Sequence, residues 1–288
     1  MRFLPLIFIA MFAFPAALHA EGSAEESPPI DIRQEELLEM VLPTTQHIHE
    51  LDISIRPNSG DVVKQDFIRM PIRLKYGITE NWEVSVTPLT YFSNFFRGRL
   101  GLFMTDVTIG TKYNFGEAYP GSGVGMAFSF SHVIPVRDDI RISDGYYHYM
   151  PGVLFSTKIK GAYILGLGIG LNLVQGKAPP GSIEPNDTMN TGVSLAFINN
   201  GVTYTLESLY VTDEIFGGQT EEAYLTPGIS LDVTGWLKEI PGVWTFSSGL
   251  RIGFLDAPQD FEVIMRLKLH LRFDYKIDVR KLMPKTGA

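Results

Sequence analysis

The sequence contains no cysteine among its 288 residues. Disulfide bonds, thiolate metal sites and a lipid-anchored amino-terminal cysteine are therefore all excluded. Basic residues are also in deficit, because 24 lysines and arginines stand against 32 aspartates and glutamates, which gives a net charge of −8. This balance argues against nucleic acid as a partner.

Long hydrophobic runs are nearly absent as well. The one such run is Phe3 to Ala17, which follows Arg2 and is followed by Leu18-His19-Ala20. This is the pattern of a secretory signal peptide cleaved after Ala20, so we predict residues 1–20 as a signal peptide. No helix-length apolar segment remains after it. Export without a membrane-spanning helix leaves the periplasm or the outer membrane as locations.

What the chain does contain is a repeated alternation of apolar and polar side chains, in about twelve stretches of roughly ten residues each, as transmembrane β-barrels require. In the last stretch, Leu267, Leu269 and Leu271 alternate with Arg266, Lys268 and His270. One face of each strand would meet lipid and the other the lumen. The predicted strands are 46–56, 66–77, 82–92, 106–115, 124–134, 147–159, 162–174, 189–197, 202–212, 223–233, 244–254 and 261–275.

The connections between these stretches support the same fold. Short turn-like sequences such as Ile198 to Gly201 alternate with longer polar or glycine-rich ones such as Gln175 to Thr188. Short periplasmic turns and longer outer loops are typical of outer-membrane barrels. We therefore predict an all-β protein, a closed antiparallel transmembrane β-barrel of about twelve strands over residues 46–279, followed by a tail at 280–288.

Residues 21–45 precede the barrel and would lie in the periplasm. Within them, Ile30 to Leu42 suits a short amphipathic helix, with Leu37, Leu38, Val41 and Leu42 near one face. Such a segment is either a solvated linker or a plug that buries these side chains inside the barrel.

Two segments resemble a known family. Leu74 to Val84 (LKYGITENWEV) is similar to its hairpin with an aromatic-glycine pair before the turn, and Thr105 to Phe115 (TDVTIGTKYNF) is similar to its strand of pattern GD-x-x-x-G-x-K-Y-x-F. The family is the outer-membrane transporter-like family named for the MetA pathway of phenol degradation. The specific likeness covers Asp66 to Val136, and Thr105 stands where the family has glycine. The resemblance implies an outer-membrane barrel that passes small organic molecules.

Small residues recur with a period of two on several neighbouring strands. In the seventh predicted strand Gly166, Gly168 and Gly170 share one face, and their neighbours carry small residues at matching positions. The pattern lacks the spacing and the following helix of a dinucleotide loop. We expect a lumen wall of small residues that either reflects barrel curvature or accommodates something bulky. Its members are Gly152, Gly166, Gly168, Gly170 and Gly192.

Charged residues also share the predicted lumen face. They would either form ion pairs that prop a narrow barrel or line a route that favours anions. The basic positions are Arg69, Arg73, Lys75, Arg251, Arg266, Lys268 and Arg272. The acidic positions are Glu83, Asp106, Glu207, Glu222, Asp232, Glu262 and Asp274.

An enzyme is the competing class, because some outer-membrane barrels of this size are hydrolases with a serine and histidine pair. Ser131 and His132 cannot face each other on one strand. His148 has the parity to approach Ser131, but a positioned third member is missing. His47 and His49 have a metal-like spacing without a second cluster. We predict neither catalytic residues, nor a metal site, nor a cofactor.

The sequence thus predicts an outer-membrane channel or transporter for small organic solutes, anionic or aromatic, in a Gram-negative-type bacterium. The expected partners are outer-membrane lipid, the solute and the barrel-assembly machinery, and no nucleic acid. The alternatives are a structural or assembly barrel with a closed lumen and, third, a lipid-modifying enzyme.

Overall fold

A computed structural model of the chain describes residues 36–58, 67–93, 102–136, 144–159, 162–176, 185–237, 242–258 and 260–272. The predicted signal peptide, residues 21–35 and the tail at 280–288 lie outside these ranges. The described residues form twelve strands and two single-turn 3₁₀ helices, η3 (Glu214–Phe216) and η4 (Thr234–Trp236). The strands are β1 (Glu50–Ile55), β2 (Phe67–Thr79), β3 (Trp82–Ser93), β4 (Leu102–Glu117), β5 (Val124–Pro135), β6 (Tyr147–Ile159), β7 (Tyr163–Gln175), β8 (Thr188–Asn199), β9 (Val202–Thr212), β10 (Glu221–Asp232), β11 (Val243–Leu255) and β12 (Phe261–Arg272).

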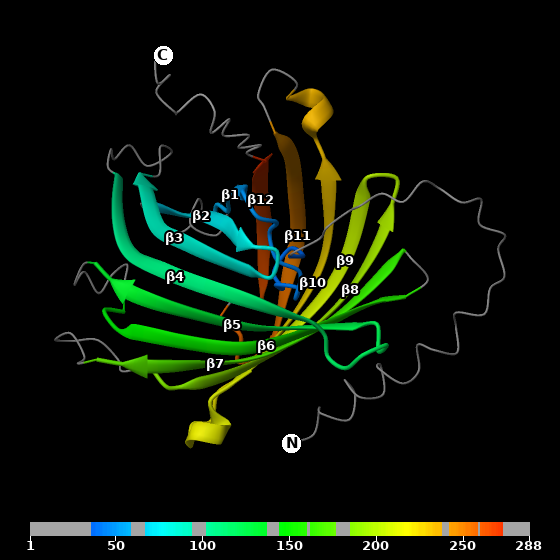
Figure 1. The fold of residues 1–288 in the computed structure, drawn as a ribbon. Helices are drawn as coiled ribbons and strands as arrows, with labels where there is room; N and C mark the ends of the chain where they lie inside the picture. Colours follow the sequence, from blue (N-terminus) through cyan, green and yellow to red (C-terminus); the bar gives the residue numbers. More distant parts are fainter. Residues whose placement is uncertain are drawn as a thin grey trace, which may run out of the picture. The chain divides into compact units, whose positions relative to one another are not determined.

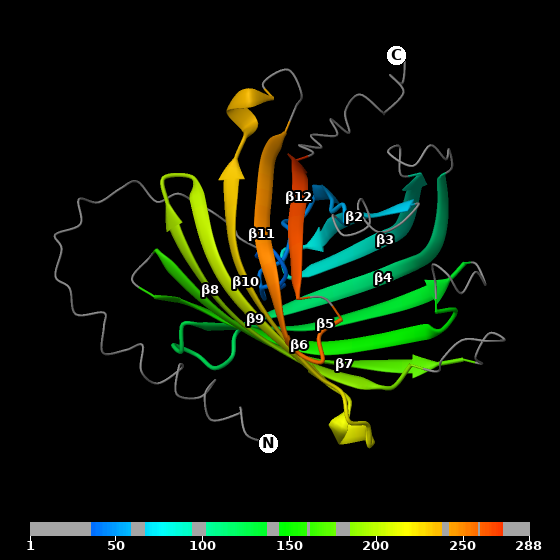
Figure 2. The ribbon, with the colours of Figure 1, turned by 180° about the vertical axis from the view of Figure 1, so that it is seen from behind.

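The strands form one closed antiparallel barrel (Figures 1 and 2). Each strand pairs with its neighbours in sequence, and β1 closes the barrel by pairing with β12. In that closing pair Glu50 lies opposite Arg272 and Ile55 opposite Leu267. The predicted fold of about twelve antiparallel strands is therefore confirmed.

The alternation of side chains decides which face of each strand is inside. On β4, Ile109 and Tyr113 are exposed on the outer face, whereas Lys112 between them is only 3 % exposed. A lysine can be that buried in a barrel because the lumen holds polar partners for it. Among the described residues, no helix is both long and apolar enough to cross a membrane.

The first strand is shorter than predicted. Residues 46–49 leave the strand because His49 has a φ of 65° and Gln46 donates its backbone N–H to the Glu83 carboxylate at 2.8 Å. A left-handed residue interrupts extended backbone, so pairing with β12 begins only at Glu50.

The two ends of the barrel differ. We call the end that carries the connections at 80–81, 160–162 and 200–201 the turn end, and the opposite end, with the connections at 56–66, 94–101 and 176–187, the loop end. The expected alternation fails for the last strands, because the turn-end connection at 233–242 is longer than the loop-end connection at 256–260.

Residues 36–46, here called the lumen segment, contact the inward faces of the strands. They contain no helix, and a bridge between Glu36 and Val41 with a bond from Leu37 N–H to the Met40 carbonyl makes a tight turn instead. The expected helix is thus not formed over Glu36 to Leu42, and residues 30–35 lie outside the described ranges. The turn is favoured over the helix because side chains of the strands satisfy the backbone groups that a helix would have paired internally.

Candidate functional site in the barrel lumen

Glu207 on β9 holds the backbone of the lumen segment. Its Oε1 accepts the N–H of Leu38 at 2.9 Å, and its Oε2 accepts the N–H groups of Glu39 at 2.9 Å and Met40 at 2.6 Å. The Glu207 side chain is buried, with the residue only 2 % exposed. One carboxylate thereby satisfies three successive backbone donors, which is the kind of compensation that buried charge requires.

Glu36 brings the lumen segment against the basic residues of β2 and β12. Its carboxylate accepts bonds from Arg73 at 2.9 Å and from Arg266 at 2.8 Å, and it lies 3.6 Å from Lys75 Nζ. Burial alone would raise the pKa of Glu36, but Lys75, Arg266 and Arg73 together hold that pKa well below its usual value. Glu36 is therefore charged at neutral pH.

Glu39 makes a matching contact with β11, the strand that pairs with β12. Arg251 on β11 donates from Nε at 3.0 Å and from Nη2 at 2.5 Å, so the pair is bidentate. Arg251 also bonds Glu262 at 2.9 Å and lies over the Tyr224 ring, 5.2 Å from its centroid. Burial raises the pKa of Glu39, but the bonds and charge of Arg251 outweigh it and lower that pKa.

Apolar side chains of the lumen segment fit against glycines of the wall. A Cβ on Gly166 would lie 3.0 Å from the Leu42 side chain, and one on Gly192 would lie 3.0 Å from Met40 Sδ. A Cβ on Gly168 would lie 3.6 Å from Met40 Cε. Three glycines of the predicted wall of small residues are thus in contact with the segment's own side chains.

A second glycine pair, which the sequence pattern did not reveal, faces Leu38. A Cβ on Gly228 of β10 would lie 2.9 Å from Leu38 Cδ2, and Gly249 of β11 faces the same methyl group. These two glycines are opposite each other in the β10–β11 ladder. Gly228 is the one glycine of β10, and on β11 Gly249 is four residues from Gly253, so no period-two glycine repeat marks them in the sequence.

The carboxy-terminal part of the segment is fixed near the turn end. Lys112 on β4 donates to the carbonyls of Leu42, at 2.9 Å, and Thr44, and it pairs with Glu83 at 3.2 Å. Thr45 Oγ1 donates to the carbonyl of Glu80 in the β2–β3 turn at 2.8 Å. The segment is therefore held along its length by polar contacts to seven strands and one turn: β2, β3, β4, β9, β10, β11, β12 and the β2–β3 turn.

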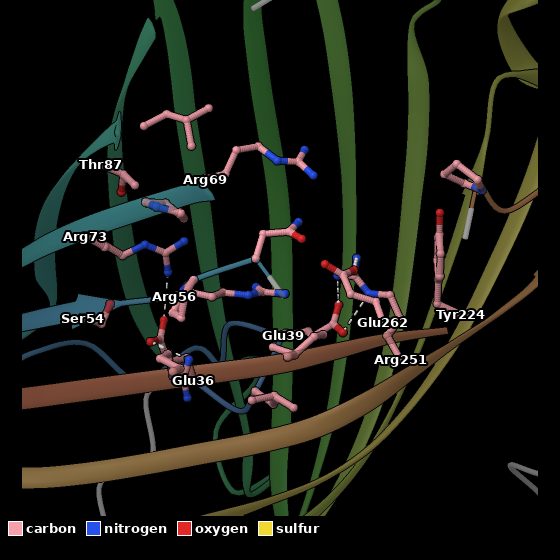
Figure 3. Close-up of a pocket in the computed structure, with 18 residues that line it drawn as sticks. Glu36, Glu39, Ser54, Arg56, Arg69, Arg73, Thr87, Tyr224, Arg251 and Glu262 are labelled. Atoms are coloured by element: carbon pink, nitrogen blue, oxygen red, sulfur yellow. Dashed lines mark hydrogen bonds and ion pairs between the residues drawn. The ribbon is translucent and has the colours of Figure 1, made fainter. Parts of the chain in front are cut away.

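Beside the segment, toward the loop end, the lumen contains a cavity of about 440 Å³. Five arginines and three glutamates line it, together with apolar side chains that include Leu89, Tyr224 and Ile264. Figure 3 shows Arg56, Arg69 and Arg73 on one side of this space and Arg251 with Glu39 and Glu262 on the other. The charged lining residues are Arg56, Arg69, Arg73, Arg251, Arg266, Glu36, Glu39 and Glu262.

The remaining predicted charged positions lie away from the cavity. Lys268 pairs with Asp52 of β1 at 2.9 Å, and Thr105 donates to Asp106 at 2.8 Å. Glu222 accepts a bond from the Tyr224 hydroxyl at 2.6 Å, Asp232 is exposed at the turn end, and Arg272 is exposed at the end of β12. Asp274 lies outside the described residues. Gly152 and Gly170 face each other across the β6–β7 ladder, with no atom of the segment near either.

The serine and histidine considered for catalysis are not brought together. Ser131 is opposite Met150, whereas His148 is opposite Val133 and bonds Asn172 at 3.0 Å and Asp144 at 2.8 Å. His132 faces outward between Tyr147 and Tyr149, with ring centroids 5.8 and 4.5 Å away. Within the described part of the chain, groups of three or more residues that could hold a metal ion are absent.

Among the charged residues that line the cavity, sequence reasoning missed three: Glu36, Glu39 and Arg56. The two glutamates are on the polar face assigned to a helix, and Arg56 ends the first predicted strand. The spacing of Glu36 and Glu39 within an otherwise apolar segment that precedes a basic lumen was the available signal.

Comparisons with known proteins support the fold. No family model matches the chain, and no curated protein matches it. Among solved structures, an outer membrane channel from Pseudomonas putida F1 is similar with a TM-score of 0.55 and 9 % identity, over 85 % of this chain and 100 % of that one. The NanC porin is similar with a TM-score of 0.50 and 12 % identity, over 77 % of this chain and 100 % of that one. At such identities the likeness concerns the barrel architecture alone.

Proposed function

We propose that the protein is an outer-membrane channel that passes small anionic organic solutes through its lumen. The observation that carries the proposal is the cavity lined by five arginines beside a segment that is attached to the walls by non-covalent contacts. Its volume of about 440 Å³ lies in the range of sites for small organic molecules. The similarity to an outer membrane channel and to a porin supports the same class.

The outer surface supports the proposed membrane location. Exposed aromatic rings gather near the turn end, at Tyr76, Trp82, Tyr113 and Tyr204. At the other end, Tyr147, Phe254 and Phe261 are exposed. Two such groups of rings separated by an apolar band match the interfacial girdles of barrels in membranes.

The first expected result concerns this location. The mature protein should fractionate with outer membranes and migrate differently on a gel before and after boiling, because a closed barrel with every strand paired resists detergent. Recovery of the folded protein in the soluble periplasmic fraction would contradict the proposal.

A second expected result concerns ion selectivity. Arg69→Gln removes a charge that lines the cavity and should lower the preference for anions in planar bilayers. Arg272→Gln is the matched control, because Arg272 is on the same barrel wall but outside the cavity lining, and it should leave selectivity nearly unchanged. Equal effects of the two substitutions would show that the cavity is not on the conduction path.

The alternative of a closed structural barrel rests on the same segment. If the contacts of residues 36–46 are permanent, they brace the strands and leave no path. Conductance and reversal potentials of the purified protein separate the two functions. A closed structural barrel should conduct neither as the wild type nor with the Arg69→Gln or Arg272→Gln substitution.

A further inference from the structure

The cavity has more positive charge than its own lining neutralises. Arg266 is only 8 % exposed and donates from Nη1 to Glu36, yet its Nε has no hydrogen-bond partner in the described residues. Arg56 also lines the cavity, and its guanidinium makes no ion pair within 4 Å of a carboxylate among those residues. The unpaired Nε of Arg266 is a buried donor, which is costly, so it points to an anionic ligand that the lining does not supply.

The two carboxylates already present reach the arginines from the lumen segment. Arg73, Arg251 and Arg266 are on strands of the closed barrel, whereas Glu36 and Glu39 are on a turn that covalent bonds tie to the barrel only through residue 46 and onward. The arginines are thus held by paired strands, whereas their partners are held to the barrel wall by non-covalent contacts alone. A fixed arginine binds any carboxylate that offers the same bidentate geometry.

We propose that this cavity is a binding site for organic dicarboxylates, and that Glu36 and Glu39 occupy it as internal competitors. The inference rests on the proposed channel function and names its substrate class. Two carboxylates are held at separate places, Glu36 by Arg73 and Arg266 and Glu39 by Arg251, so a ligand with two carboxylates replaces both. Leu89, Tyr224 and Ile264 line the same space and suit the carbon chain between them.

Binding of a dicarboxylate and release of the segment are therefore linked. A dicarboxylate on the arginines leaves Glu36 and Glu39 without their cations, which are the groups that offset their burial. The segment then loses its attachment to β2, β11 and β12, and displacement of Glu39 moves its neighbour Met40 away from β8. The contacts of Lys112 with Leu42 and Thr44 remain. Because linkage is reciprocal, the docked segment weakens ligand binding by the same factor by which bound ligand weakens docking of the segment.

The test is calorimetric titration of the full-length protein in detergent with succinate, glutarate and adipate. Glutaramide, the neutral analogue, and inorganic sulfate serve as control ligands. At least one dicarboxylate should bind while glutaramide does not, and sulfate should bind more weakly. Equal affinity for sulfate and for every dicarboxylate would overturn the assignment to an organic diacid.

Variants test the competition itself. Glu36→Gln with Glu39→Gln should tighten dicarboxylate binding by about tenfold, because the internal competitors are gone. Arg251→Gln should weaken it by a similar factor. The control for the double glutamine variant is Glu214→Gln with Asp256→Asn, and the control for Arg251→Gln is Lys158→Gln. Each removes the same charges at exposed positions outside the cavity lining and should leave affinity unchanged. Unchanged or weaker binding in the double glutamine variant would overturn the proposal.

A second measurement tests the competition without the double glutamine variant, in case that variant does not fold. Met40→Cys with Gly192→Cys joins the segment to β8, so dicarboxylate affinity should fall in the oxidised protein and return on reduction. Equal affinity in both states would also overturn the proposal. Since binding is measured without conductance, a protein that binds but does not conduct contradicts the channel, and one that conducts but does not bind contradicts the site.

Discussion

Deletion of residues 36–46 is expected to convert the barrel to a permanently open channel in planar bilayers. The segment contacts the inward faces of strands on opposite walls, from Lys112 of β4 to Arg251 of β11 and Glu207 of β9. A part held between opposite walls obstructs the lumen, so its removal should raise conductance from a low level to a steady high one. Heat-dependent gel migration of the variant checks that the barrel has assembled.

A disulfide bond that fixes the segment to the barrel wall should, in contrast, close the channel. Met40 Cγ lies 3.5 Å from the place of a Cβ on Gly192, which is within reach of a disulfide. Because the chain has no cysteine of its own, Met40→Cys with Gly192→Cys offers one pairing only. Openings seen in the wild type should disappear on oxidation and return on reduction, and either single substitution should show neither effect. Equal conductance of wild type, deletion and oxidised protein would make the segment a linker without a gating role.

Glu207→Gln is expected to release the segment while the barrel stays intact. The glutamate accepts three backbone N–H groups of the segment, and each hydrogen bond to a charged group contributes about 1.5–3 kcal/mol. Glutamine is neutral and keeps one acceptor oxygen, so docking of the segment should weaken by at least about 2 kcal/mol, which corresponds to about 30-fold.

The measurement uses Leu37→Cys as a reporter. Leu37 is fully buried, so a cysteine there should react slowly with a maleimide reagent, and Glu207→Gln should accelerate the reaction by about the same 30-fold. Glu222→Gln is the matched control, because Glu222 is on the neighbouring strand β10 and bonds Tyr224, not the segment. Acceleration of equal size in both variants would mean that the substitutions loosen the barrel and not the docking of the segment.

The strands could be predicted from the sequence because the lipid-facing pattern is local. Each strand alternates with a period of two, and β6 and β9 begin and end at the residues that the pattern predicts. The start of β1 could not be predicted, since Gln46 and His47 alternate like a strand but are drawn away by the carboxylates of Glu83 and Glu50. Glu83 is on β3, and Glu50 contacts His47 through a local turn that precedes β1, so alternation alone predicts neither contact.

The barrel and its strand order follow from side-chain alternation and turn spacing, because both are properties of neighbouring residues. The contacts that the charged side chains make inside the barrel depend on the folded chain as a whole. Arg73, Arg251 and Arg266 are far from Glu36 and Glu39 along the chain, and their contacts depend on closure of the barrel around residues 36–46. The same closure decided that the segment forms a turn, because Glu207 satisfies backbone donors that would otherwise favour a helix.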